Sequence, residues 1–132
     1  MKRILVVISI LAFVLVGCGK KGKPDDVPQE VYDALVPLVN TLDEYIKGDA
    51  DLDDLQTASS KASDYIVAFY ENSDAAPTSP EYRKGTALIS DTSKLSLALS
   101  KSYLSIGTGS NDKDTIKEVK EILKSLKKNI GM

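Results

Sequence analysis

The residue types that most often carry catalysis are scarce in this chain of 132 residues. It contains no His and a single Cys, Cys18. Without His, neither a Ser-His-Asp triad nor a Cys-His pair can form, and the His ligands of haem and of di-iron helical bundles are missing. Acidic residues are plentiful, so a hydrolase working with carboxylates alone stays open, although nothing in the pattern marks any pair. We therefore expect no catalytic residue, no cofactor, no nucleic-acid partner, and a protein that is not an enzyme.

Carboxylates are most concentrated in the segment Asp49-Ala50-Asp51-Leu52-Asp53-Asp54. Oxygen ligands at alternate positions suit calcium, and the start of this segment resembles an EF-hand loop. The resemblance fails at the sixth position, which is Asp54 rather than Gly, and at the twelfth, which is Ser60 rather than Glu. Helix capping explains the same residues without a metal, with Asp51 as N-cap and Asp54 as its capping-box partner. We favour capping and expect no metal site.

The first eighteen residues have the pattern of a secretion signal. Lys2 and Arg3 are followed by residues 4–16, in which only Ser9 is not apolar. This apolar run is shorter than the ~20 residues of a membrane-spanning helix and suits the hydrophobic region of a signal peptide. It ends in Leu15-Val16-Gly17-Cys18, with a small residue directly before the only thiol.

This ending resembles the lipobox of bacterial lipoproteins, with an aliphatic residue three positions before an invariant Cys. The resemblance implies a signal peptide over residues 1–17, cleaved between Gly17 and Cys18. It also implies diacylglycerol on the Cys18 sulfur and often a further acyl chain, such as palmitate, on the new amine. Two or more chains, at ~0.8 kcal/mol per buried CH2, give stable anchoring. An uncleaved anchor, or a plain signal peptide with a coincidental Cys, are the alternatives.

The lipoprotein reading places the domain outside the cytoplasm, anchored in a membrane through acyl chains on Cys18. Residue 19 is Gly rather than the Asp that commonly marks inner-membrane retention, which favours the outer membrane if the host has two. Residues 18–28 are polar and contain Gly and Pro, as in a flexible linker. Lys20, Lys21 and Lys23 either contact anionic headgroups or are merely solvated.

Four amphipathic segments follow, at about residues 28–47, 52–71, 79–106 and 112–129. Their apolar residues recur at steps of three and four, which predicts helices; the stripes include Leu35, Leu38, Leu55, Ile66, Leu95, Leu99, Ile106, Val119 and Leu126. Gly48, Ser79 with Pro80, residues 107–110, and Asn111 or Asp112 are the expected boundaries. Pro37 predicts a kink or a local break inside the first helix. No segment alternates as a strand does.

Short polar connections between four helical stripes predict an all-α fold, an antiparallel up-down four-helix bundle over residues 29–132. One Cys permits no internal disulfide, so the core alone must stabilise it. Residues 25–81 carry fourteen acidic and two basic residues, a net of −12, whereas residues 82–132 carry ten basic and five acidic residues, a net of +5. Opposite charges favour docking of the two halves, and the acidic half is either a solvated face or a surface for a basic partner.

Function is therefore predicted only in outline. The leading hypothesis is a lipid-anchored domain that binds another envelope protein, as secretion pilotins and exclusion lipoproteins do. The resemblance to those proteins lies only in size, anchor and helicity. The alternative is a small-ligand or ion-binding bundle with a site between helices near Pro37, lined by Tyr and carboxylates. The six Tyr residues mostly lie on or beside the apolar stripes and suit the core or its rim.

Overall fold

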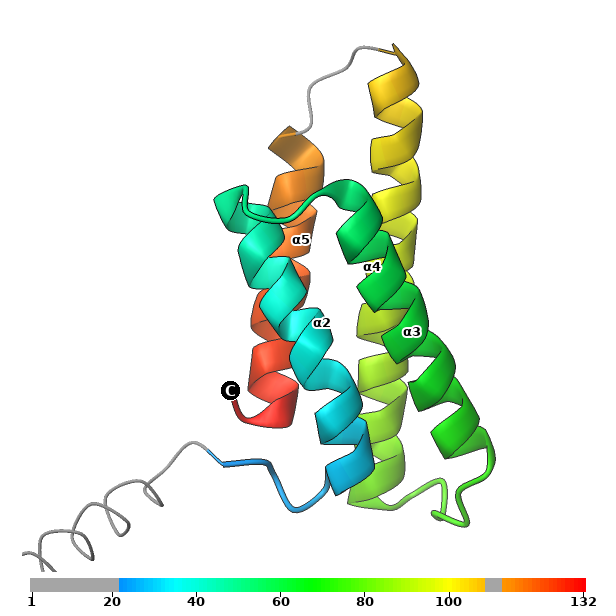
Figure 1. Ribbon diagram of the computed structural model, residues 1–132. Helices are drawn as coiled ribbons and strands as arrows, with labels where there is room; N and C mark the ends of the chain where they lie inside the picture. The colour runs from blue at the N-terminus through cyan, green and yellow to red at the C-terminus, as the bar shows by residue number, and fades with distance from the viewer. Residues whose placement is uncertain (1–21, 109–112) are drawn as a thin grey trace, which may run out of the picture.

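The protein is a bundle of four helices with no strand in the part of the chain that the structure describes (Figure 1). The computed structural model describes residues 22–108 and 113–132, with the side chains of 106–108 left aside. The helices are α2 (Gln29–Lys47), α3 (Leu52–Glu71), α4 (Pro80–Thr108) and α5 (Lys113–Ile130). The all-helical prediction is confirmed. None of these helices is both long and apolar enough to cross a membrane.

Local chemistry explains several of the helix ends. Asp51 accepts a hydrogen bond from the Asp54 N–H at 2.8 Å, and the Asp54 carboxylate accepts one from the Asp51 N–H at 3.3 Å. This capping box, which satisfies N–H groups that lack helical partners, confirms the predicted start of α3. Ser79 accepts from the Tyr82 N–H at 3.1 Å at the start of α4. Gly48 ends α2 in the left-handed conformation, with φ of 87°.

Two predicted interruptions can be compared with the structure: at Pro37, where a kink or a local break is expected, the break is absent, and at residue 107, where a turn is expected to begin, the chain is still helical. Helix α2 continues through Pro37 without a break, because the proline removes one N–H while five apolar side chains of the helix remain buried. Helix α4 extends to Thr108, so Gly107 and Thr108 are helical rather than part of a turn. The rest of that predicted turn, the cap at Asn111 or Asp112 and the Ile106 side chain lie outside the described residues.

The helices pack in a ring, each against two neighbours. Helix α2 contacts α3 and α5, and α4 contacts the same two, whereas no Cα atoms of the described diagonal pairs lie within 8 Å. The centre of the ring is filled by aliphatic side chains from all four helices; the largest fully buried ones are Leu35, Leu38, Leu42, Leu55, Ile66, Leu88, Leu95, Leu99, Leu126 and Ile130. These are the positions that the three-and-four spacing predicts, so the core is one continuous cluster.

The chain before α2 also belongs to this packed body. Val27, which the sequence placed in the flexible linker, is fully buried in the core. The Lys23 amine donates to the Val27 carbonyl at 2.6 Å. At the other end of the chain, Gly131 lies so close to Gly22 that an added Cβ would stand 2.3 Å from the Gly22 carbonyl oxygen. Residues 22–28 are therefore attached to the bundle, beside its C-terminal end.

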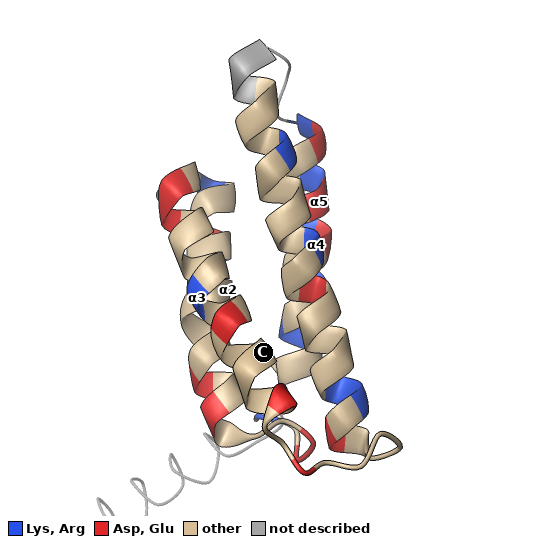
Figure 2. Cartoon of the chain, turned by 90° about the vertical axis from the view of Figure 1, so that its right-hand side faces the viewer, with Lys and Arg blue, Asp and Glu red and all other residues tan. Residues whose placement is uncertain are grey.

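Ion pairs join the acidic and basic halves. Lys127 lies 2.6 Å from Asp43, linking α5 to α2, and Lys84 lies 3.6 Å from Asp26. A third described pair, between Lys101 and Glu118, lies within the basic half. Figure 2 shows acidic positions on α2, α3 and their connections, and most basic positions on α4 and α5. All three pairs are partly exposed, so they orient the helices more than they stabilise them.

Helices α3 and α4 pack closely at one glycine, Gly85. The ring of Tyr70, only 9% exposed, lies over Gly85, where an added Cβ would stand 2.5 Å from the Tyr70 Cε1 atom. The buried Tyr70 hydroxyl has no hydrogen-bond partner among the described residues. Gly85 is therefore required by packing, because a larger residue would push the ring out of this contact.

We predict that Gly85→Ala lowers the free energy of unfolding by about 1–2 kcal/mol, because overpacking outweighs the gain in helix propensity. The measurement is urea unfolding followed by circular dichroism. In a Tyr70→Ala background the same substitution should become neutral or stabilising by up to about 1 kcal/mol, since the clashing ring is gone. An equal loss in both backgrounds would contradict the packing explanation.

Candidate functional site

The residues that the sequence predicts as the lipid-attachment and cleavage site, Cys18 and Gly17, lie outside the described part of the chain. Lys20 and Lys21 lie outside it as well. Lys23 is described, and its amine donates to the carbonyls of Pro24 and Val27 rather than extending away from the body. The candidate binding sites among the described residues lie on the helices.

The acidic segment before α3 forms a helix cap. Asp51 and Asp54 form the capping box, and Asp53 accepts a hydrogen bond from the Tyr103 hydroxyl of α4 at 2.5 Å. Among the described residues, no group of three or more His, Cys, Asp or Glu could hold a metal ion. The acidic segment thus serves the start of α3 and its contact with α4.

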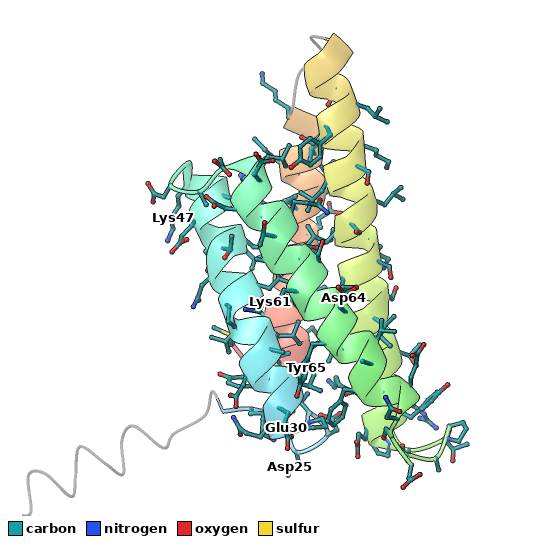
Figure 3. The ribbon with its side chains drawn as sticks, turned by 45° about the vertical axis from the view of Figure 1, so that its right-hand side comes forward. Asp25, Glu30, Lys47, Lys61, Asp64 and Tyr65 are labelled. Atoms are coloured by element: carbon teal, nitrogen blue, oxygen red, sulfur yellow. The ribbon has the colours of Figure 1, made fainter. Side chains whose placement is uncertain are left out.

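A groove of about 490 Å³ lies between α2 and α3, at the position of Pro37. We call it the α2–α3 groove. It is lined from α2 by Glu30, Asp33, Ala34, Pro37 and Leu38, and from α3 by Ala58, Lys61, Ala62 and Tyr65. Its volume lies in the range of small-ligand sites. Figure 3 shows Glu30 from α2, and Lys61 and Tyr65 from α3, on this side of the bundle.

The lining divides into an apolar floor and a polar rim. Leu38 and Ala62 are buried and form the floor, whereas Glu30, Asp33 and Lys61 are exposed at the rim. Tyr65 is 44% exposed and stacks on Phe69 of the same helix, with ring centroids 6.4 Å apart. A ligand in this groove would place apolar groups inward and polar groups at the edge.

Pro37 changes the backbone hydrogen bonding of α2 beside the groove. Because proline has no N–H, the carbonyl of Asp33 lacks the helical donor that would come from position 37. The Asp33 carboxylate, on the same turn, accepts a 2.8 Å hydrogen bond from Gln29. The α2 side of the groove carries the carboxylates of Glu30 and Asp33, whose oxygens can accept hydrogen bonds from a ligand.

A second, smaller groove of about 320 Å³ lies between α4 and α5. Its rim combines Lys94 and Lys101 with Glu118 and Glu121. Asp91, 5% exposed, lines it and accepts hydrogen bonds from Ser125 at 2.7 Å and Asn129 at 3.1 Å. Asp91 thus joins α4 to α5 through neutral donors. The mixed charges of this groove select no particular ligand class.

Two tyrosines have shifted ionisation. Burial, reinforced by the charges of Glu81 and Asp26, raises the pKa of Tyr70 to about 12. The hydrogen bond to Asp53 raises the pKa of Tyr103 to about 12, since it favours the protonated phenol. Both tyrosines lie outside the α2–α3 groove, so neither shift marks it as a reaction centre.

The groove lies beside Pro37, where the sequence suggested a site, but most of its lining residues could not be predicted from the sequence. Pro37 was marked by its own chemistry, and tyrosine with carboxylates was expected beside it. Ala34, Ala58 and Lys61 carry no signal by themselves, since small and basic residues occur throughout helices. These residues line one groove because a face of α2 lies beside a face of α3. The spacing of residues within each helix predicts the two faces, but it does not predict that α2 and α3 are neighbours.

Comparison with known proteins adds no family to this description. No family model matches the chain, and no match was found among curated proteins or solved structures.

We predict that Asp51→Ala lowers the free energy of unfolding by about 1 kcal/mol, because the N-cap acceptor of α3 is lost. Asp49→Ala is the matched control and should change it by less than about 0.5 kcal/mol, as for an ordinary surface residue. Both are measured by urea unfolding with calcium and with a chelator. A rise in unfolding midpoint with calcium that Asp51→Ala abolishes would contradict the capping role.

We predict that Tyr70→Phe reduces the loss of stability at alkaline pH. The pKa of Tyr70 is about 12 in the folded protein and 10 in its ordinary state, so the protonated phenol stabilises the fold below pH 10. That contribution is lost as the pH rises from 10 to 12. The measurement is the unfolding free energy across this range, with tyrosinate absorbance following ionisation. An unchanged pH dependence in the variant would contradict the assignment.

Proposed function

We propose that the protein is a bacterial lipoprotein that is exported, cleaved before Cys18 and anchored to a membrane by acyl chains, palmitate among them, on that residue. The observation that carries this proposal is the ending Leu15-Val16-Gly17-Cys18 after a basic start and an apolar run. The domain then lies outside the cytoplasm, on the outer membrane if the host has two. Its proposed role is non-catalytic, namely binding another envelope protein.

The proposal takes the bundle as antiparallel, with neighbouring helices running up and down in turn. Helices adjacent in sequence contact each other, and the connections between them are short, at residues 48–51 and 72–79. A short connection between two packed helices reverses the direction of the chain. The order of colours along the helices in Figure 1 supports this arrangement.

The packed segment before α2 would hold the domain close to the membrane. Only three residues separate Cys18 from Gly22, which lies against Gly131 at the end of the bundle. At ~3.3–3.6 Å per residue, a fully extended chain from Cys18 to Gly22 spans at most about 14 Å. In the proposed state, the end of the bundle that carries Val27 and the C-terminus therefore faces the lipid headgroups.

A second candidate function is binding of a small ligand, and the α2–α3 groove favours it. Pro37, Tyr65 and two carboxylates line a space of suitable volume. Against it, the core behind the groove is continuous, and the groove lies on the surface between only two helices. A surface groove with an apolar floor suits a segment of another protein at least as well.

We predict that Cys18→Ala abolishes lipid attachment completely, because no other residue of the chain can take the thioether-linked lipid. The measurements are incorporation of labelled palmitate and distribution between membrane and soluble fractions after expression in a bacterium. Cys18→Ala should lose the label and leave the membrane fraction after cleavage or remain as an uncleaved precursor. Palmitate labelling that survives the substitution, or wild-type protein without label, would contradict the lipoprotein assignment.

Crosslinking of the lipidated wild-type protein in its own envelope separates the two functions. A specific envelope-protein adduct supports the leading function. Its absence, together with stabilisation against heat by a small molecule, favours the second candidate.

A further inference from the structure

We propose that the α2–α3 groove binds a basic, amphipathic helical segment of a partner protein. This inference deepens the proposed function and rests on its protein-binding role. It follows from three observations: the apolar floor of the groove, the acceptor groups on its α2 side, and the acidic charge of the two helices that form it.

The floor suits the apolar face of a helix. Ala34 and Leu38 from α2 face Ala58 and Ala62 from α3 across the groove. The alanines leave room between the two helices for side chains from outside. Because an amphipathic helix presents apolar side chains every three or four residues, it can fill a groove that runs between two helices with one row of them.

The α2 rim selects donors of hydrogen bonds. Glu30 and the Asp33 carboxylate are both acceptors. In the described chain neither carboxylate forms a salt bridge. Lys and Arg side chains carry several N–H donors and a positive charge, so they satisfy this rim better than neutral or acidic groups do.

The charge around the groove favours a partner with several basic residues. The acidic half, residues 25–81, has a net charge of −12 and includes both helices of the groove. A single small cation gains mainly from the nearest carboxylates, whereas a polycationic segment gains from the field of the whole face. This comparison favours a protein segment over a small organic cation.

Lys61 is the only basic residue of the lining and opposes such a partner. It is exposed, and Figure 3 shows it on α3 beside α2. Its removal should therefore strengthen the binding of a basic segment, a result that an apolar interaction alone would not produce. This opposite sign makes Lys61 a sensitive test of the charge argument.

The test uses the mature lipidated protein in nanodiscs of phosphatidylcholine. The signal from nanodiscs without the protein is subtracted. The probe is a labelled peptide of Leu and Lys arranged as an amphipathic helix, followed by fluorescence anisotropy at low salt. We expect it to bind about tenfold more tightly than a Leu and Glu peptide of the same pattern. A Leu and Lys peptide of the same composition in scrambled order should bind about tenfold more weakly, because its apolar residues do not form one face.

Variants locate the binding on the protein. The double variant Glu30→Gln, Asp33→Asn should weaken binding of the basic peptide about tenfold. The control Glu44→Gln, Asp64→Asn removes the same number of charges outside the groove, one from α2 and one from α3, and should weaken it less than about threefold. Lys61→Gln should strengthen it about threefold. Circular dichroism and unfolding midpoints verify that each variant is folded.

Three outcomes would overturn the proposal. Equal loss in the two double variants would show a diffuse electrostatic attraction, and equal binding of the acidic peptide would show apolar adhesion. Displacement of the peptide by spermidine, with equal affinity, would make the groove a small-cation site. Each of these outcomes can occur with palmitate-labelled, membrane-anchored protein, so failure here is distinguishable from failure of the lipoprotein assignment.

Discussion

The structure depends on one constraint: four apolar stripes must cover one another without help from any covalent link. With a single Cys, the chain has no internal disulfide, and none of its helices could bury its stripe alone. Packing in a ring buries all four stripes, because the apolar face of each helix contacts two neighbouring helices and the shared core. Val27 extends the same core beyond the helices and fixes residues that would otherwise be linker. Because residues 22–28 belong to the packed body, only three residues of the sequence lie between Cys18 and that body.

The size of the side chains at each helix pair decides where the ring is closed and where it is open. Between α3 and α4, the Tyr70 ring lies on Gly85 and fills the space that the glycine leaves. Between α2 and α3, Ala34 faces Ala58 and Ala62, and a groove remains. Small residues thus give a tight contact where the buried ring of Tyr70 covers them and an open groove where the only lining ring, Tyr65, is exposed. The groove is therefore a property of helix pairing rather than of any one residue.

The charges of the chain are separated into an acidic half, residues 25–81, and a basic half, residues 82–132. The acidic half and the basic half meet through partly exposed pairs such as Lys127 with Asp43, which contribute little stability individually. Most acidic residues of α2 and α3 are exposed, where they can act on a partner rather than on the fold (Figure 2). In the proposed lipoprotein, the anchor holds this acidic face near a membrane at a defined end of the bundle. Anchoring and partner binding would then be tasks of separate parts of one small chain.

The sequence by itself determined the helices, because caps, prolines and three-and-four spacing are local features: α3 begins and ends where predicted, and Asp51 forms the predicted box. It also determined the lipobox resemblance, which rests on adjacent residues. The tertiary structure alone decided which helices are neighbours, that Tyr70 rather than Tyr65 is buried, and that Val27 joins the core. It also decided that Ala58, Lys61 and Glu30 line one groove. The physical reason is that spacing along a helix fixes which residues share a face, whereas the partner of that face depends on side chains far away in the chain.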